Sequence, residues 1–363
     1  MKKLFIFTIF IFPTLAISKF ALNKSCKSCH PIIFNEYQKA MHSKATVFKD
    51  PLHNALWKIS PYYKQKKYVC ATCHTPADTT MAGSLEHNLT MMPQFAFESG
   101  KDGVACSYCH RIKDIKHAEK ENKNIINPNE KEYFGNILKP KKNIFHTSKS
   151  NKNFKNGNVC IGCHSHYKND YGVNICSTND HNELDSANCV SCHMPKIYGK
   201  PATNSDKKIH AYHGFAGIHN DIFMLSKYVS IEILRGIDRF FIAINNKSPH
   251  ALTLHPMRVM ELRVLVKRDD NITKFPPKKF VRLIGKNGKI TTPWQAREII
   301  KNTSIKGNEK RVSTYKYALK KGDIVDVQIG YYLINEKIAK KLHITNIKNE
   351  FLTLKRKAFV IKK

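Results

Sequence analysis

The chain has few acidic side chains and little arginine. It carries 28 Asp and Glu against 61 Lys and Arg, a formal net charge of +33, and only 10 of the basic residues are Arg. A positive field of this strength attracts anions, acidic proteins and anionic membrane surfaces. Lysines spread evenly along a chain are equally typical of a lysine-rich proteome. No segment carries a nucleic-acid-binding motif, so we expect no nucleic-acid partner.

Long hydrophobic runs are also scarce, and the one clear run lies at the N-terminus. Lys2 and Lys3 precede an apolar stretch at 4–17, and Ala16-Ile-Ser18 forms a small-x-small cleavage site. This pattern is typical of a secretory signal peptide over residues 1–18, because the run is shorter than the ~20 residues that span a bilayer. We predict a periplasmic mature protein that begins near residue 19. An uncleaved anchor is the alternative.

Cysteine is absent from the chain after residue 192. All 11 cysteines lie between Cys26 and Cys192, and 15 of the 18 histidines lie before residue 221. Residues 19–221 have few long periodic stretches, so they lack an apolar core of their own size. From residue 222 the sequence becomes rich in β-branched and aromatic residues that alternate in period two. We predict a mostly irregular and α-helical domain over 19–221 and an antiparallel β-sandwich over 222–363.

Local patterns predict several elements within these two domains. In the first we expect helices at 34–48 and 51–57 and polar loops at 116–131 and 147–158. In the second we expect strands at 228–234, 239–245, 259–266 and 323–332. Asn287-Gly288 lies between two strand-like stretches and predicts a tight hairpin turn. Helices and strands do not alternate in the second domain, so nothing there suggests a parallel sheet.

Ten of the cysteines belong to one repeated motif, C-x-x-C-H, which occurs five times. This is the attachment signature of haem c. The two thiols form thioethers with the two vinyl groups of the porphyrin, and the following histidine binds the iron as the proximal ligand. We therefore predict five covalently attached haem c groups. The motif residues are Cys26, Cys29 and His30; Cys70, Cys73 and His74; Cys106, Cys109 and His110; Cys160, Cys163 and His164; and Cys189, Cys192 and His193.

Two other uses of paired cysteines are zinc binding and dithiol redox chemistry. Neither explains a histidine after every pair. The remaining thiol, Cys176, is typical of a small buried or free surface residue, with a role at a haem as the alternative. Five large apolar porphyrins on a short segment would form most of its core, and their close spacing would let electrons pass from one iron to the next.

Thirteen histidines remain after the five proximal ones, which favours a second axial histidine on most haems. Several stretches also resemble the multihaem family of cytochromes c-552 and c-554. They are Phe34-Asn-Glu-Tyr37, Ala40-Met-His42-Ser-Lys-Ala45, Gly103-Val-Ala-Cys106-Ser-Tyr-Cys109-His110-Arg-Ile, Cys189-Val-Ser-Cys192-His193-Met-Pro and His213-Gly-Phe-Ala-Gly217. A weaker resemblance reaches Asn245-Asn-Lys-Ser-Pro-His250 and Arg258, where the family usually has Gly in place of Pro249.

The resemblance implies that His42, His146 and His213 are distal iron ligands. For the other two haems the candidates, in falling order, are His250, His87, His53 and His219. The family includes electron carriers, so the first functional hypothesis is a carrier between redox partner proteins, with a membrane quinol-linked donor and a periplasmic acceptor. No catalytic residue is predicted for a carrier.

The second hypothesis is a multihaem oxidoreductase that acts on a small nitrogen or sulfur species at one haem with an open axial position. Two specific enzymes are disfavoured. The chain has no C-x-x-C-K motif, which pentahaem nitrite reductases use at their catalytic haem, and hydroxylamine oxidoreductases carry more than five haems. We favour the carrier because the supply of histidine ligands exceeds the demand.

Overall fold

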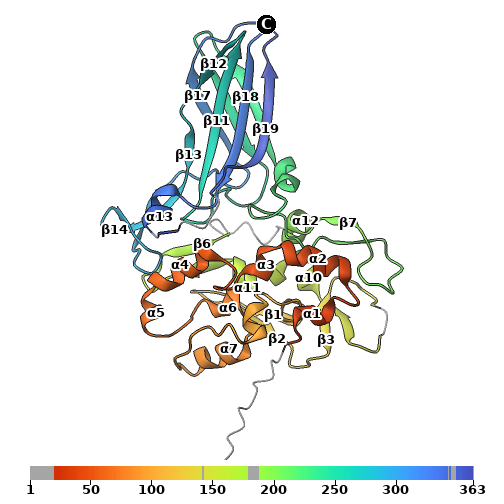
Figure 1. Cartoon of the computed structure of the whole chain (residues 1–363). Helices are drawn as coiled ribbons and strands as arrows, with labels where there is room; N and C mark the ends of the chain where they lie inside the picture. Colours follow the sequence, from red (N-terminus) through yellow and green to blue (C-terminus); the bar gives the residue numbers. More distant parts are fainter. Residues whose placement is uncertain (1–19, 141–142, 179–187, 342, 345–348, 363) are drawn as a thin grey trace, which may run out of the picture.

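The computed structural model describes residues 20–140, 143–178, 188–341, 343–344 and 349–362. The signal peptide that we predict at 1–18 lies outside these ranges. Among the described residues, no helix combines the length and the apolar character that a membrane span needs. Figure 1 shows two regions, a lower one of short helices and small strands and an upper one of long strands.

The lower region consists of short helices. Its N-terminal helices are α1 (Asn23–Cys26), α2 (Pro31–Lys39), α3 (Met41–Lys44), α4 (Pro51–Ile59), α5 (Pro61–Lys64), α6 (Ala71–His74), α7 (Thr79–Glu86), α8 (Glu98–Lys101) and α9 (Cys106–Cys109). Three of them begin at a proline, which is favourable where the first N–H has no helical partner. Asp50 caps α4, where its side chain accepts from the N–H groups of Leu52 and His53.

The helix that we expect at 34–48 is two helices, because the chain turns to an extended conformation at Ala40 (φ −70°, ψ 151°). The helix expected at 51–57 is present as α4. The expected loops at 116–131 and 147–158 are partly ordered, because short stretches there pair with neighbouring chain. The rest of this region consists of short strands and helical turns: β1 (Ile112–Lys116), β2 (Lys123–Ile126), β3 (Glu132–Gly135), β4 (Thr147–Ser150), α10 (Lys152–Asn156), η1 (Asn158–Cys160), α11 (Ile161–His164), β5 (His166–Lys168), β6 (Asn174–Ser177), α12 (Cys189–His193), β7 (Lys196–Tyr198) and β8 (Ile209–Ala211).

The upper region is built from antiparallel strands. Its elements are η3 (Ile222–Tyr228), β9 (Val229–Arg235), β10 (Arg239–Asn246), β11 (Val259–Arg268), β12 (Asn271–Lys274), β13 (Lys278–Phe280), β14 (Arg282–Lys286), β15 (Lys289–Ile290), β16 (Glu298–Asn302), β17 (Lys310–Lys316), β18 (Ile324–Tyr332), α13 (Glu336–Lys341) and β19 (Leu352–Val360). One sheet has the order β17-β10-β9, and another has the order β12-β11-β18-β19 with β13 also on β11. All four strands that the sequence predicts are present.

The expected hairpin is also present, because Asn287 and Gly288 join the antiparallel strands β14 and β15. Both residues have positive φ, 53° and 69°, which the tight primed turns of hairpins require. β14 is the middle strand of a small third sheet, β15-β14-β16.

The hydrophobic cores of the two regions differ in size. The side chains of the two larger sheets in the upper region pack into a single buried cluster that includes Ile231, Ile242, Leu262 and Val327. The lower region has only small separate clusters, one around Tyr108 and another around Trp57, Tyr68 and Met81. Side chains alone therefore fill the upper core, whereas the lower region has no core of comparable size among its described residues.

The two regions meet through the β5–β6 hairpin and the sheet that contains β14. Val173 and Ile175 pack with Ile284 and Ala296 in one apolar cluster. The side chain of Asn169 donates to two backbone carbonyls across this boundary, those of Pro293 (2.8 Å) and Ala296 (2.7 Å). A buried asparagine that satisfies the backbone of the other region fixes their relative position, because both carbonyls would otherwise lose a hydrogen bond.

Candidate haem sites

Each C-x-x-C-H motif lies on a single short helical turn. Cys26 ends α1, and the other motifs are carried by α6, α9, α11 with η1, and α12. Residues three apart share one face of a helix, so the two thiols of a motif point the same way, as one porphyrin edge requires. No disulfide joins any of the cysteines. Burial raises the pKa of the Cys70 and Cys109 thiols to about 12.

The proximal histidines are oriented by backbone carbonyls from distant parts of the chain. A carbonyl that accepts from the Nδ1–H of a ring leaves the Nε2 lone pair free for a metal, and this is the usual arrangement of metal-binding histidines. Four proximal histidines have it. The Nδ1 to carbonyl oxygen distances are 2.6 Å for His30 to Pro201, 3.0 Å for His74 to Ala45, 2.7 Å for His110 to Phe134 and 2.6 Å for His193 to Ala216.

Three of these histidines face a second histidine at a distance that accommodates one metal ion. An imidazole nitrogen binds a metal at about 2 Å, and the ring centre lies about 1 Å behind it, so two axial rings have centres about 6 Å apart. His30 and His146 have ring centres 6.4 Å apart. The separations are 6.3 Å for His110 and His213 and 6.1 Å for His193 and His250. The donor pairs therefore fit one haem iron each.

A fourth pair is formed by His42 and His164. Their ring centres are 5.8 Å apart and the ring planes are nearly perpendicular, at 85°. Burial lowers the pKa of His42 to about 3, so this ring is a neutral imidazole, the form that binds metals. Burial lowers the pKa of His164 as well, although its side chain retains solvent-accessible surface.

The second motif differs from the other four. The ring nearest to His74 is that of His53, at 4.0 Å between centres, which is too close for an iron between them. Both rings place Nδ1 against the same carbonyl, that of Ala45. The Nε2 atom of His53 lies 3.3 Å from the hydroxyl of Tyr68. Among the described residues, no histidine ring faces His74 at the separation of the other pairs.

The remaining predicted ligands lie elsewhere. His87 is exposed at the C-terminal end of α7. His219 accepts a hydrogen bond from Arg258, 2.9 Å from Nη2 to Nε2. Cys176 lies on β6, near the guanidinium groups of Arg258 and Arg282. Within the described ranges, no group of three or more His, Cys, Asp or Glu side chains forms a metal cage.

The motifs contact one another through their cysteines. The side chain of Cys26 interacts with that of Cys106, which joins the first motif to the third. The fourth motif has more neighbours. Cys163 contacts Cys73 of the second motif and interacts with Cys109 of the third, and Cys160 contacts Cys189 of the fifth. The order in space is therefore first, third and fourth, with the second and fifth both adjacent to the fourth.

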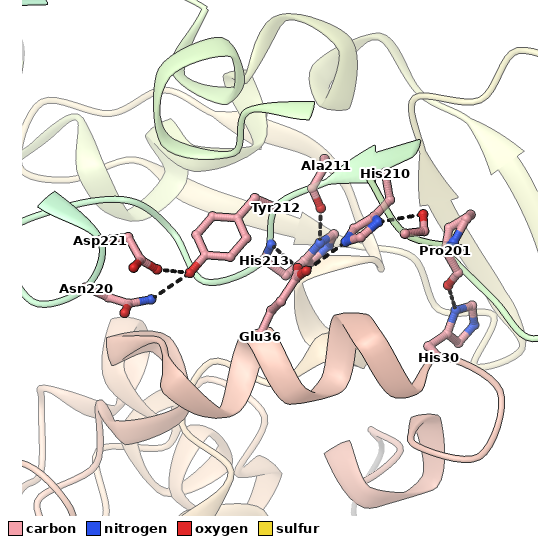
Figure 2. Close-up of polar contacts among 10 residues, drawn as sticks. His30, Glu36, Pro201, His210, Ala211, Tyr212, His213, Asn220 and Asp221 are labelled. Atoms are coloured by element: carbon pink, nitrogen blue, oxygen red, sulfur yellow. Dashed lines mark hydrogen bonds and ion pairs between the residues drawn. The ribbon is translucent and has the colours of Figure 1, made fainter. Parts of the chain in front are cut away.

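A largely covered carboxylate for which the sequence predicted no role supports one of the distal histidines. Glu36 of α2 accepts from the backbone N–H of His213 and pairs with Nε2 of His210, both at 2.9 Å (Figure 2). The Nδ1 atom of His210 lies 2.9 Å from the carbonyl of Gly199, so both of its nitrogens are occupied and it is not an iron ligand. Glu36 lies within the family-like stretch Phe34-Asn-Glu-Tyr37, but the sequence predicted no role for it, because its partners are about 175 residues away.

The comparisons with known proteins agree with this geometry. Residues 25–111 match the family model described as cytochrome c554 and c-prime. The fold is similar to that of a penta-haem cytochrome c552 from Thermochromatium tepidum, with a TM-score of 0.76 and 19% identity over 94% of this chain and 99% of that one. A superoxide reductase from Nanoarchaeum equitans matches 36% of the chain and 90% of its own, at a TM-score of 0.20 and 12% identity. A search of curated proteins gave no match.

Residues 25–111 are therefore similar to a multihaem c-type cytochrome family, and the fold as a whole is similar to that of a penta-haem cytochrome. The cofactor of this chain is haem c, attached covalently at the five C-x-x-C-H motifs. The prediction that the fold combines short helices with antiparallel strands is confirmed. Electron transfer is the general activity of this class.

Proposed function

We propose that this protein is an exported electron carrier that passes electrons through five closely spaced haems between respiratory partner proteins. The observation that carries the proposal is the set of four histidine pairs with ring centres 5.8–6.4 Å apart. Haem c bound in this way supplies a reversible one-electron couple. A pair of imidazoles fills both axial positions, which favours electron transfer over chemistry at the iron.

The arrangement of the motifs supports a branched path. The fourth motif contacts the second, third and fifth, so electrons that enter at the first or second could leave at the fifth. The backbone carbonyls at Pro201, Phe134 and Ala216 hold the proximal rings in one tautomer. Such fixed ligands keep the reorganisation on electron transfer small, because neither ring has to rotate when the iron changes its charge.

The two larger antiparallel sheets suit a β-sandwich over residues 222–363 that serves as a docking module for the partner. We place the mature protein in the periplasm, with a membrane quinol-linked donor, because the N-terminal pattern at 1–18 favours export. Cytochrome c maturation also requires an exported chain. N-terminal sequencing of the mature protein checks this: a start near residue 19 in the periplasmic fraction supports export and cleavage, and an intact Met1 in washed membranes contradicts cleavage.

The direct test is the haem count with a spin-state assignment. Protein from a host that matures c-type cytochromes should contain five haems that acid acetone does not extract. Low-temperature electron paramagnetic resonance should show four low-spin ferric haems with two axial histidines. A haem count of three or fewer, or a spectrum in which most haems are high spin, would contradict the proposal.

A further inference from the structure

Arg258 is a partly exposed but desolvated cation at the boundary of the two regions. It precedes β11, and burial lowers its pKa from the usual value. Its guanidinium donates to Nε2 of His219, and among the described residues it forms no ion pair with a carboxylate. A desolvated charge without a counter-ion costs free energy, so the Arg258 side chain favours an anionic ligand.

Two histidines beside this guanidinium add ring N–H groups as further hydrogen-bond donors. His219 accepts from Arg258 at Nε2, so its proton is on Nδ1. His255 accepts from the backbone N–H of Met257 at Nδ1 (3.3 Å), so its proton is on Nε2. This tautomer is opposite to that of the proximal histidines, whose Nδ1 atoms lie against carbonyls. His255 thus presents a hydrogen-bond donor where an iron ligand would present a lone pair.

These groups lie near the second haem site. His219 has an exposed side chain and His255 and Arg258 are partly exposed, yet burial lowers the pKa of both histidines to about 3. The electrostatic influence of His74 contributes to the lowered pKa of His255. That of Arg258 contributes to the lowered pKa of His164. Among the histidines that the structure describes, none lies opposite the proximal histidine of the second motif at the 6 Å separation.

We propose that Arg258, His219 and His255 form a binding site for a small inorganic oxyanion beside the haem of the second motif. The guanidinium fork and the two ring N–H groups are hydrogen-bond donors, and a ligand with several oxygen acceptors can engage them together. The hydroxyl of Tyr331 donates its hydrogen bond to the carbonyl of Leu252, at 2.8 Å, so we do not count it among the donors of this site. The site goes beyond electron transfer, because it admits a ligand that a carrier does not need.

The experiment uses the complete haem-loaded protein in its oxidised state, with nitrite and sulfite as probes and chloride at equal ionic strength as the reference. Calorimetry measures the dissociation constant, and the ferric haem spectrum reports a change at one haem. We expect one saturable site in the wild type. Arg258→Gln should weaken it at least about tenfold, because it removes a charged donor.

The matched control is Arg239→Gln, which removes an exposed arginine of β10 that pairs with Asp238. It should leave the dissociation constant unchanged. His255→Gln should weaken binding several-fold, and it decides the question if Arg258→Gln fails to fold. No saturable binding in the wild type, or equal weakening by Arg239→Gln, would overturn the site. Neither result alters the haem count, so the electron-carrier proposal fails or stands separately.

Discussion

The interiors of the two regions of this protein are filled in different ways. In the β strands, side chains such as Ile242, Leu262 and Val327 fill the space between two sheets. In the helical region, apolar clusters are small, and many histidine and cysteine side chains retain accessible surface although protein surrounds them. The difference teaches that one chain can contain a region that folds on its own contacts and another that depends on covalent cofactors for its interior.

The largest effect should follow from withholding haem. The full chain, expressed in a cytoplasm without the maturation machinery, should lose the structure of residues 20–221, whereas the strands of 222–363 stay folded. The reason is that the missing haems leave the lower region without an interior. Limited proteolysis with mass spectrometry measures this difference. Equal resistance of both regions to the protease would contradict the predicted dependence of the lower region on haem.

The next largest effect is expected for His42→Ala. The ring of His42 faces that of His164 at 5.8 Å, so its removal vacates one axial position and should turn one haem high spin and able to bind carbon monoxide. The potential of that haem should rise because a donor to ferric iron is lost. The measurement is the spectrum of the reduced protein with carbon monoxide.

His343→Ala is the matched control, because His343 is exposed and lies in the C-terminal region. Its spectrum should equal that of the wild type. A His42→Ala variant that remains fully low spin, with no carbon monoxide adduct, would show that His42 is not the ligand opposite His164.

A smaller effect is expected at Glu36. Glu36→Gln keeps one acceptor but loses the charge that pairs with His210, so the loop that carries His213 should loosen. We expect a loss of about 1–3 kcal/mol in the free energy of unfolding, which is typical for leaving a buried partner unsatisfied. The redox potential of one haem should also shift. Glu98→Gln, at an exposed pair with Lys101, should change neither quantity.

The smallest effect concerns an ion pair in the β strands. Asp323 accepts from two nitrogens of Arg268 at 2.8 Å, and this pair holds the pKa of the carboxyl below its ordinary 3.8. Its stabilisation is therefore complete above the unfolded pKa and is lost as pH falls through the folded value. Asp323→Asn should lower the melting temperature of the β strands at pH 7 but hardly at pH 2. Asp238→Asn, at an exposed pair, is the control.

Local chemistry in the sequence identified much of this protein before its structure. The C-x-x-C-H spacing is a single helical turn, so it specifies haem attachment without any tertiary contact. Period-two alternation likewise predicted β10, β11 and β18, and Asn287-Gly288 predicted its hairpin. The helix expected at 34–48 is interrupted at Ala40, because α3 turns away to bring His42 toward His164.

Which histidine faces which motif was decided by the tertiary structure alone. His250 lies 57 residues after His193 in another region, and no local pattern links them. The sequence ranks His87 above His53 as a candidate, yet His87 is exposed and His53 lies 4.0 Å from His74, too close for an iron between them. The sequence predicted no role for Glu36 or His255. Spacing along a chain determines chemistry within one turn of helix, whereas a separation of about 6 Å between two rings exists only after distant segments pack together.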